Sequence, residues 1–214
     1  VGAMRPATAV SADGPLNIIN AVKVAVDAAS AGQGVLMMMN DEIYSGRDVT
    51  KTNTANVATF KATNGGPLGF IVGGEVHYYY RSVRPHTLQS EFDVSGVTAL
   101  PRVDIIYTHI GEDRVFVDAA LAAGARGIIY AGSGMGSIHE AVEAALAEAV
   151  DRGVAVVRSS RTGSGIVAAG LERWQEQGFL YADNLNPQKA RLLLQLALLR
   201  TQARNEVQSV FLKY

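Results

Sequence analysis

Lys51 is the residue of this sequence best suited to proton chemistry, because hydroxyl and amide side chains surround it in the run Asp48-Val49-Thr50-Lys51-Thr52-Asn53-Thr54. A lysine that is buried in a polar pocket can act as a base, or it can activate a neighbouring hydroxyl. Most lysines instead stay solvated at the surface of a protein. The residue types alone leave both interpretations of Lys51 open.

A glycine-rich run, Gly132-Ser133-Gly134-Met135-Gly136-Ser137, is the second place where chemistry could occur. It follows a predicted strand and precedes a predicted helix, and Ser137 is a good helix N-cap by residue type. Glycines let a backbone approach a ligand closely, and a helix N-terminus offers free N–H groups to an anion. The spacing is not the full dinucleotide fingerprint. The run therefore indicates either a plain tight turn or a carboxylate or phosphate site.

Two further polar stretches lie in the second half of the sequence. Residues 158–165 read Arg-Ser-Ser-Arg-Thr-Gly-Ser-Gly after an apolar run, which is typical of a surface connection or of a mobile gate over a site. Glu172 and Glu176 then flank Trp174 at helical spacing. Carboxylates of this kind usually belong to a solvated helix face.

The four histidines, His77, His86, His109 and His139, do not pair with one another or with a carboxylate at metal-ligand spacing. We expect structural or surface roles for them, and no metal site and no cofactor. No Gly-x-Ser-x-Gly elbow follows an apolar strand, although spacing alone does not exclude a Ser-His-Asp triad.

The composition excludes several classes of protein. The 214 residues include 19 basic and 20 acidic side chains, which leaves no basic surplus for a dedicated nucleic-acid binder. No apolar run approaches the roughly 18 residues of a membrane span. The chain has no cysteine, which removes disulfides, thiolate zinc sites and cysteine nucleophiles.

The elements of the first half must position Lys51. Residues 16–29 have helical spacing, residues 34–39 form an apolar run typical of a strand buried on both faces, and residues 70–80 read as a hairpin around Gly73-Gly74. Residues 81–101 lack a period and contain two prolines, which predicts a linker. The sequence opens on Val1-Gly2-Ala3, which reads like the end of a buried strand, so we expect the first domain to be incomplete.

The second half repeats one strand–helix unit. The predicted strands are residues 103–107, 127–130, 154–157 and 178–181, and the predicted helices are residues 115–123, 138–150 and a long helix from Pro187 onward. The second of these helices has one apolar stripe, made of Ile138, Val142, Ala145, Leu146 and Ala149, and in the third we expect Leu192, Leu193, Leu196 and Leu199 to be buried. Alternating strands and helices imply a parallel sheet with right-handed crossovers. The predicted fold class is α/β, with two three-layer, parallel-sheet domains: an incomplete first domain over residues 1–80, a linker over 81–101 and a Rossmann-like second domain over 102–214.

Many separate motifs occur here in an order that resembles bacterial type II L-asparaginases and glutaminase-asparaginases, and the resemblance runs from end to end of the chain. The motifs are Val1-Gly2-Ala3-Met4-Arg5-Pro6, Ser11-Ala12-Asp13-Gly14-Pro15, Asn40-Asp41, the run around Lys51, His86-Thr87, Phe92-Asp93, Leu100-Pro101, Arg158-Ser159-Ser160-Arg161 and Leu185-Asn186-Pro187-Gln188-Lys189-Ala190-Arg191.

The resemblance implies hydrolysis of L-asparagine to L-aspartate and ammonia through a threonine nucleophile. Lys51 matches the family's catalytic lysine, and Ala3 matches an alanine whose backbone contacts the substrate's amide end. Ser137 takes a position where many members have asparagine, and Glu172 falls at the glutamate that recognises the α-amino group. The nucleophile candidates precede Val1 in the family, so we expect these 214 residues alone to be inactive.

The resemblance also implies an assembly and a compartment. In the family the residues at positions 137 and 172 reach into a neighbouring subunit's site, which implies a homodimer at least and usually a tetramer. We expect a small-molecule substrate, no nucleic-acid or membrane partner, and the periplasm or else the cytoplasm. Two alternatives stay open: a glutaminase-asparaginase that uses L-glutamine comparably, and a catalytically silent binding module.

Overall fold

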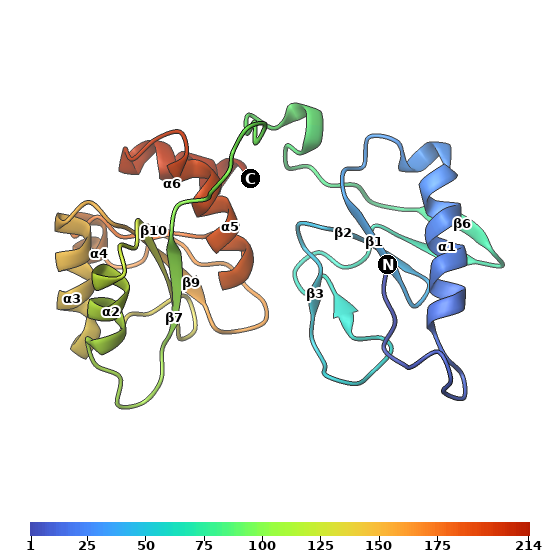
Figure 1. The fold of residues 1–214 in the computed structure, drawn as a ribbon, viewed down its shortest axis with the longest axis horizontal. Coiled ribbons are helices and arrows are strands. Elements are labelled where there is room, and N and C mark those ends of the chain that lie inside the picture. The colour runs from blue at the N-terminus through green and yellow to red at the C-terminus, as the bar shows by residue number, and fades with distance from the viewer. The chain divides into compact units, whose positions relative to one another are not determined.

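The computed structural model describes residues 1–214, which form two compact units, Val1–Ser90 and Glu91–Tyr214 (Figure 1). Each unit has its own sheet, its own helices and its own apolar core. No helix of the chain combines the length and the apolar character that crossing a bilayer requires.

The first unit is a helix packed on a small antiparallel sheet. The four-stranded sheet has the order β1-β2-β5-β6, and β3 and β4 form a separate two-stranded ladder. The elements are α1 (Gly14–Val26), η1 (Ala28–Ser30), β1 (Leu36–Met39), β2 (Glu42–Ser45), β3 (Thr50–Lys51), β4 (Phe60–Lys61), β5 (Gly69–Val72), β6 (Glu75–Tyr78) and η2 (Thr87–Gln89). The predicted hairpin is confirmed as β5 and β6, joined by Gly73 and Gly74.

The antiparallel sheet of this unit differs from the parallel sheet that we expected. β1 and β2 form a hairpin whose two turn residues, Asn40 and Asp41, have φ angles of 54° and 60°. Two consecutive left-handed residues make the tight turn that matches the twist of a hairpin, and asparagine and aspartate tolerate that conformation best after glycine. The chain therefore reverses directly after β1, where the sequence indicated a polar segment leaving a buried strand.

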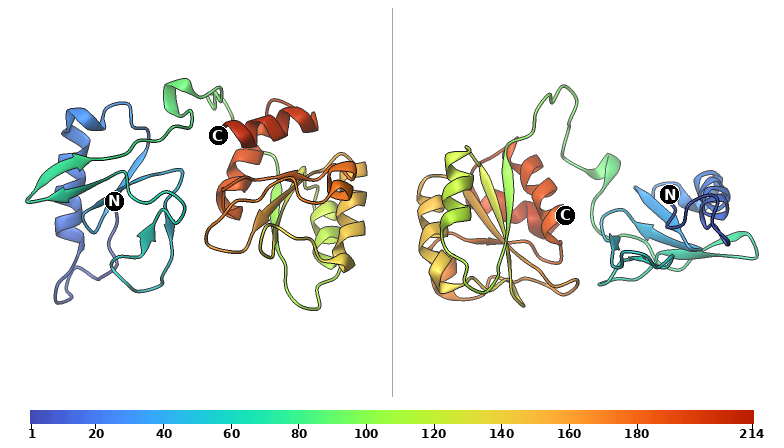
Figure 2. Two further views of the ribbon diagram at one scale, coloured as in Figure 1. Left: turned by 180° about the vertical axis from the view of Figure 1, so that it is seen from behind. Right: turned by 60° about the horizontal axis from the view of Figure 1, so that its bottom comes forward.

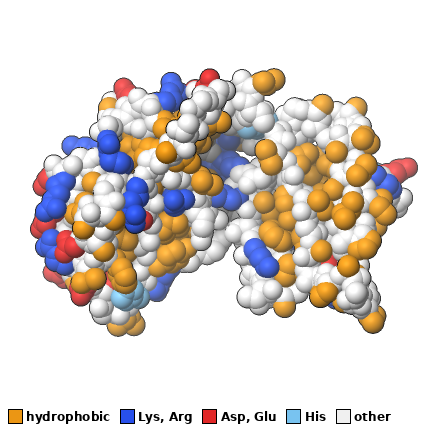
Figure 3. All heavy atoms as spheres, viewed as in Figure 1, with side chains coloured by type: hydrophobic (Ala, Val, Ile, Leu, Met, Phe, Trp, Pro, Cys, Tyr) orange, Lys and Arg blue, Asp and Glu red, His pale blue; other side chains and the backbone are white.

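The core of the first unit is small, and α1 turns a polar side toward the rest of the unit. Val24, Met38, Ile43 and Ile71 make up the buried apolar cluster. Asn17 and Asn20 of α1 are also buried, whereas the helix's apolar residues Leu16, Ile18, Ile19, Val22 and Val26 are each more than half exposed. Figure 3 shows hydrophobic side chains gathered over this part of the surface.

The second unit is a three-layer sandwich around a parallel sheet of order β10-β9-β8-β7. Its elements are β7 (Val103–Tyr107), α2 (Val115–Ala122), β8 (Gly127–Gly132), α3 (Glu140–Asp151), β9 (Ala155–Ser160), α4 (Glu172–Glu176), β10 (Leu180–Tyr181), α5 (Pro187–Leu198) and α6 (Arg204–Lys213). The predicted strands and the first two predicted helices of this half are therefore confirmed, with shifts of a few residues at their ends. The long helix predicted from Pro187 onward is instead two helices, α5 and α6, separated at residues 199–203.

Helices cover both faces of this sheet. Both views in Figure 2 show α2 and α3 on one face and α5 with α6 on the other. The apolar stripe predicted for α3, which includes Val142, Leu146 and Ala149, is buried in the first of the two core layers. In α5, Leu193 is buried as expected, but Leu192 and Leu199 are exposed by 52% and 39%, because the side of the helix that faces the sheet runs through Ala190, Leu194 and Ala197 instead.

Candidate functional site

Lys51 lies on β3, in a two-stranded antiparallel ladder where it faces Phe60 of β4. The side chain is exposed, and its ammonium makes no hydrogen bond or ion pair within this chain. The other lysine of the ladder, Lys61, is instead paired with Glu42, with 2.6 Å between Nζ and Oε2. The ladder therefore presents one neutralised ammonium and one ammonium that is available to a ligand or to a further segment of protein.

The polar neighbours of Lys51 hold its backbone rather than its ammonium. Thr59 is fully buried, and its hydroxyl accepts a hydrogen bond from the Asn53 amide at 2.8 Å and donates one to the Asn53 carbonyl. Thr52 donates both its amide and its hydroxyl to the Thr59 carbonyl, each at 2.8 Å. These bonds close the loop directly after Lys51, so the position of the lysine is fixed by the hydroxyl groups around it.

The loop that carries Ala3 is fixed by a carboxylate. Asp13 directly precedes α1, where it would be expected to cap the helix, but its side chain makes no capping bond. Its oxygens instead accept hydrogen bonds from the amides of Met4 and Arg5, at 2.9 Å each. These two N–H groups hold the pKa of Asp13 below its ordinary value. Ala3 itself is exposed, next to the anchored residues.

Two buried asparagines of α1 extend this anchoring. The Asn17 side chain donates to the Gly2 carbonyl at 3.0 Å and accepts from the Asn40 amide at 3.0 Å. Asn20 donates to the Asp41 carboxylate at 2.7 Å. One helix thus ties the opening loop to the β1–β2 turn. The roles of Asp13 and Asn17 were not predicted from the sequence, although a polar position inside an otherwise apolar helix is a signal that could have identified Asn17.

Ser137 lies at the end of a tight turn and does not cap a helix. Its amide donates to the Ser133 carbonyl at 2.9 Å, and the turn contains Gly134 and Gly136, both with positive φ. α3 begins three residues later, and its N-cap is His139, whose side chain accepts from the Ala141 amide at 3.3 Å. The expected N-cap role of Ser137 is therefore wrong, and the geometry fits the plain tight turn. The Ser137 side chain is exposed.

Glu172 is the first residue of α4, a short helix that Trp174 anchors. The Trp174 ring is buried, and its indole N–H donates to Glu143 Oε2 of α3 at 3.1 Å. Arg173 forms an ion pair with the same carboxylate at 3.0 Å, and this guanidinium is the main cause that holds the pKa of Glu143 below its ordinary value. Glu172 is exposed, as the sequence analysis expected of a solvated helix face.

Arg158 is the principal correction to the sequence analysis of this unit. The run from Arg158 was expected to be a surface loop or gate, but Arg158, Ser159 and Ser160 continue β9, and the Arg158 side chain is completely buried. No acidic side chain pairs with its guanidinium, whose polar contacts are all with backbone carbonyls. Burial lowers the pKa of Arg158 to about 10. The sequence signal was weak, because an arginine after a strand is usually at the surface.

A second buried polar group lies at the carboxyl ends of β7 and β8. Glu112 is 5% exposed, and one carboxylate oxygen accepts from the hydroxyls of Thr108 and Tyr130 at 2.5 and 2.7 Å. Burial, aided by this carboxylate, raises the pKa of Tyr130 to about 12. The three side chains satisfy one another, so they fix the ends of two strands and leave no group pointing into a cavity.

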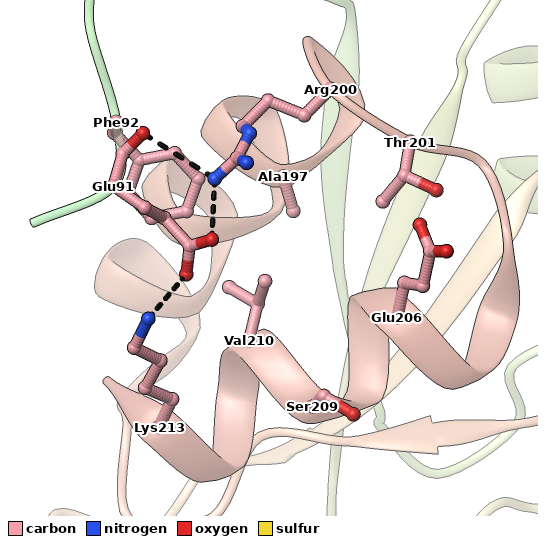
Figure 4. Close-up of a pocket in the computed structure, with 9 residues that line it drawn as sticks. All are labelled: Glu91, Phe92, Ala197, Arg200, Thr201, Glu206, Ser209, Val210 and Lys213. Atoms are coloured by element: carbon pink, nitrogen blue, oxygen red, sulfur yellow. Dashed lines mark hydrogen bonds and ion pairs between the residues drawn. The ribbon is translucent and has the colours of Figure 1, made fainter.

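The cavity beside α5 and α6 contains none of the predicted site residues. It has a volume of about 520 Å³, and Figure 4 shows Glu91 at its edge between Arg200 and Lys213. Glu91 accepts from Arg200 at 2.5 Å and from Lys213 at 2.9 Å, and these two cations hold its pKa below the ordinary value. The Glu91 carboxylate and the two cations are thus paired with one another.

The structure divides the four predicted site residues between the units. Lys51 and Ala3 belong to the first unit, on segments that Thr59 and Asp13 hold, and Ser137 and Glu172 belong to the second. No group of three His, Asp or Glu side chains could hold a metal ion.

Comparisons with known proteins match both units to one family. Residues 1–84 match the model "Asparaginase, N-terminal", and residues 102–211 match "Glutaminase/Asparaginase C-terminal domain". The chain is 48% identical to "L-asparaginase 2" of Escherichia coli (strain K12), over all of this chain and 62% of that protein. It is 45% identical to "Probable L-asparaginase periplasmic" of Haemophilus influenzae, over 99% of this chain and 61% of that protein. It is 43% identical to "Glutaminase-asparaginase" of Pseudomonas fluorescens, over all of this chain and 59% of that protein. The chain thus spans about three-fifths of the length of these curated relatives.

Proposed function

The chain belongs to the asparaginase and glutaminase-asparaginase family, and from this membership we propose that the whole protein hydrolyses the side-chain amide of L-asparagine to L-aspartate and ammonia. The observation that carries the proposal is that the two family models match the two units in order, over residues 1–84 and 102–211. Two relatives that are 48% and 45% identical to the chain over the aligned residues are named as asparaginases.

In the proposed reaction, a threonine hydroxyl supplied by a segment outside these 214 residues attacks the amide carbon. Ammonia leaves, and water then hydrolyses the acyl-enzyme to free aspartate. The Lys51 ammonium stabilises the alkoxide that develops on the threonine, because an adjacent positive charge favours the ionised form of a hydroxyl. The unpaired state of Lys51 and the bonds that fix its backbone support this role.

The other three site residues are proposed to bind substrate. The backbone at Ala3 contacts the amide end, on a loop whose neighbouring amides Asp13 holds. Ser137 and Glu172 contact the α-amino acid end, and Glu172 supplies the negative charge that an ammonium group requires. We propose that these two residues act in a site of a neighbouring subunit, which makes the whole protein a homo-oligomer, and a tetramer when four sites assemble.

L-Glutamine is the second candidate substrate, and the 43% identity to a protein named glutaminase-asparaginase favours it. The two amides differ by one methylene, which a binding pocket typically discriminates by only about 1–3 kcal/mol. For the location of the protein we propose the periplasm, because one relative carries that word in its name.

The test measures ammonia release by the purified whole protein from L-asparagine and from L-glutamine, with intact mass and oligomeric state determined on the same sample. We expect L-aspartate and ammonia in equal amounts, from an oligomer. A whole protein that binds L-asparagine but releases no ammonia would be a binding module, and this result would overturn the proposal.

A further inference from the structure

We infer that Arg158 is a positioning residue: it locks the Ser137 turn and the Glu172 helix into one fixed arrangement, so that two recognition residues far apart in the sequence act as a unit. The part of this inference that concerns recognition rests on the proposed function. The part that concerns the arrangement rests on contacts within the second unit alone.

The guanidinium of Arg158 joins two segments that are separate in the sequence. Nη1 donates to the carbonyl of Gly136, the residue before Ser137, at 3.4 Å. Nη2 donates to the carbonyls of Ala168 and Ala169 at 2.5 Å each, in the segment that leads into α4. A single side chain therefore makes polar contact with the residue before Ser137 and with the backbone three and four residues before Glu172.

The helix that carries Glu172 is attached to the same guanidinium through an aromatic ring. The Arg158 guanidinium carbon lies 4.5 Å from the centre of the Trp174 ring, within the range of a cation–π interaction. Glu143 holds the same ring by accepting a hydrogen bond from its indole N–H at 3.1 Å. Because Trp174 and Glu172 lie within one short helix, a displacement of the ring moves Glu172 as well.

Two glycines, Gly136 and Gly170, lie where the backbone packs too closely against its neighbours to accommodate a side chain. A Cβ atom on Gly136 would lie 2.8 Å from Val167 Cγ1, and a Cβ atom on Gly170 would lie 2.9 Å from both Arg158 Nη1 and the Trp174 ring. Both glycines also have φ angles near 75°. A side chain at Gly136 would push the Ser137 turn away from Val167, and one at Gly170 would push the segment before α4 away from Arg158 and Trp174. The two glycines therefore permit the close packing around the arginine.

A role in folding stability alone does not explain this arginine. Burying a charge without a counter-charge costs free energy, and apolar side chains of similar volume often stabilise such a core better. Nε of Arg158 is buried and has no partner, so the desolvation is not even fully compensated. The planar guanidinium directs several hydrogen bonds at once in fixed directions, which an apolar side chain cannot do.

The test uses Arg158→Met and Arg158→Lys, with Arg161→Met as the matched control. Methionine keeps the apolar length of the side chain but has no donors, and lysine keeps the charge but not the planar fork. Arg161 is exposed near the end of the same strand, and its guanidinium donates to the Thr108 carbonyl at 3.0 Å, away from both segments.

The first readout is amide hydrogen exchange in the 214-residue chain. We expect Arg158→Met to accelerate exchange by about tenfold or more in residues 133–137 and in residues 167–174 together, while β8 keeps its parent rates. Arg158→Lys should fall between Arg158→Met and the parent, and Arg161→Met should match the parent in both segments. If amide exchange became faster in only one of the two segments, or equally throughout the second unit, Arg158 would not couple the two segments.

The second readout is KM against kcat for L-asparagine in the whole protein. We expect Arg158→Lys to raise KM by about tenfold and to lower kcat by less than about threefold, because the residue positions binding groups rather than reacting ones. An equal fall in kcat with unchanged KM would contradict the inference. A parent protein without amidase activity would contradict the proposed function, but the exchange result would still decide whether Arg158 couples the two segments.

Discussion

The polar residues around Lys51 form hydrogen bonds with the backbone of their own loop and not with the lysine ammonium. The sequence identified Lys51 because hydroxyl and amide side chains cluster around it, and this clustering left two interpretations open: a polar pocket around the ammonium, or a solvated lysine. In the structure Thr52, Asn53 and Thr59 bond instead to the backbone. Thr59 could not be predicted, because its role depends on a loop closing over six residues, and no local pattern encodes that closure.

Substitution of Thr59 by valine tests whether the Thr59 hydroxyl holds the loop that follows Lys51. Valine keeps the shape of threonine but leaves the amide and carbonyl of Asn53 without their partner, so we expect the first unit to lose about 1–3 kcal/mol of unfolding free energy. Turnover of the whole protein should fall as well, although Lys51 is intact. Urea denaturation monitors the stability, and Thr54→Val, at an exposed neighbouring position, should stay within about 0.5 kcal/mol of the parent. Equal behaviour of the two variants would show that Thr59 does not hold the loop.

Among the helices and strands, hydrophobic periodicity correctly predicted the elements that bury an apolar face in the core. The stripe of α3 and the short apolar runs of β7 and β8 locate these elements to within a few residues. The β1–β2 hairpin was missed because its turn is formed by Asn40 and Asp41 rather than by glycine. The inward direction of Arg158 was missed because its three carbonyl acceptors come from two distant segments.

The contact between α3 and α4 predicts a specific response to acid. The pKa of Glu143 is lowered in the folded state, so the folded carboxylate binds fewer protons than the unfolded one. Its contribution to stability is therefore complete above the ordinary glutamate pKa, near 4.5, and is lost as the pH falls through the lower folded value. We expect Glu143→Gln to cost about 1 kcal/mol at pH 7 and to flatten the decline of the melting temperature below pH 4.5. Thermal melts from pH 7 to pH 3 provide the measurement. Glu176→Gln, on the exposed side of α4, should keep the parent's slope, and a Glu143→Gln slope equal to the parent's would refute the assignment.

At the scale of the whole molecule, the two units differ greatly in how much apolar surface they bury. The second unit has a core layer on each face of its sheet, with 15 and 12 buried residues, whereas the buried apolar cluster of the first unit contains four. The boundaries that the sequence suggested, residues 1–80, 81–101 and 102–214, stay a prediction. Composition and alternation of elements indicated the α/β class, which the family assignment supports. The hydrophobic periodicity of one unit contains no information on which residues of another unit or subunit complete an active site.

This difference predicts that the second unit folds alone. Residues 91–214 should unfold cooperatively at a temperature within a few degrees of the main transition of the 214-residue chain, because both core layers lie inside that range. Residues 1–90 should unfold at a lower temperature or not cooperatively, since small cores are marginal. Circular dichroism melts of the two pieces measure this. If residues 91–214 alone showed no cooperative melting transition, the folding of the second unit would depend on the first unit.

The proposed role of Lys51, which is to activate a threonine hydroxyl in amide hydrolysis, is tested by the matched variants Lys51→Met and Lys61→Met in the whole protein. Both lysines lie on the β3–β4 ladder, but only Lys61 is paired with a carboxylate. We predict that Lys51→Met lowers kcat for ammonia release from L-asparagine by at least about a hundredfold, while Lys61→Met retains most of the parent's turnover. Turnover of Lys51→Met close to that of the parent, or equal losses in the two variants, would contradict the account.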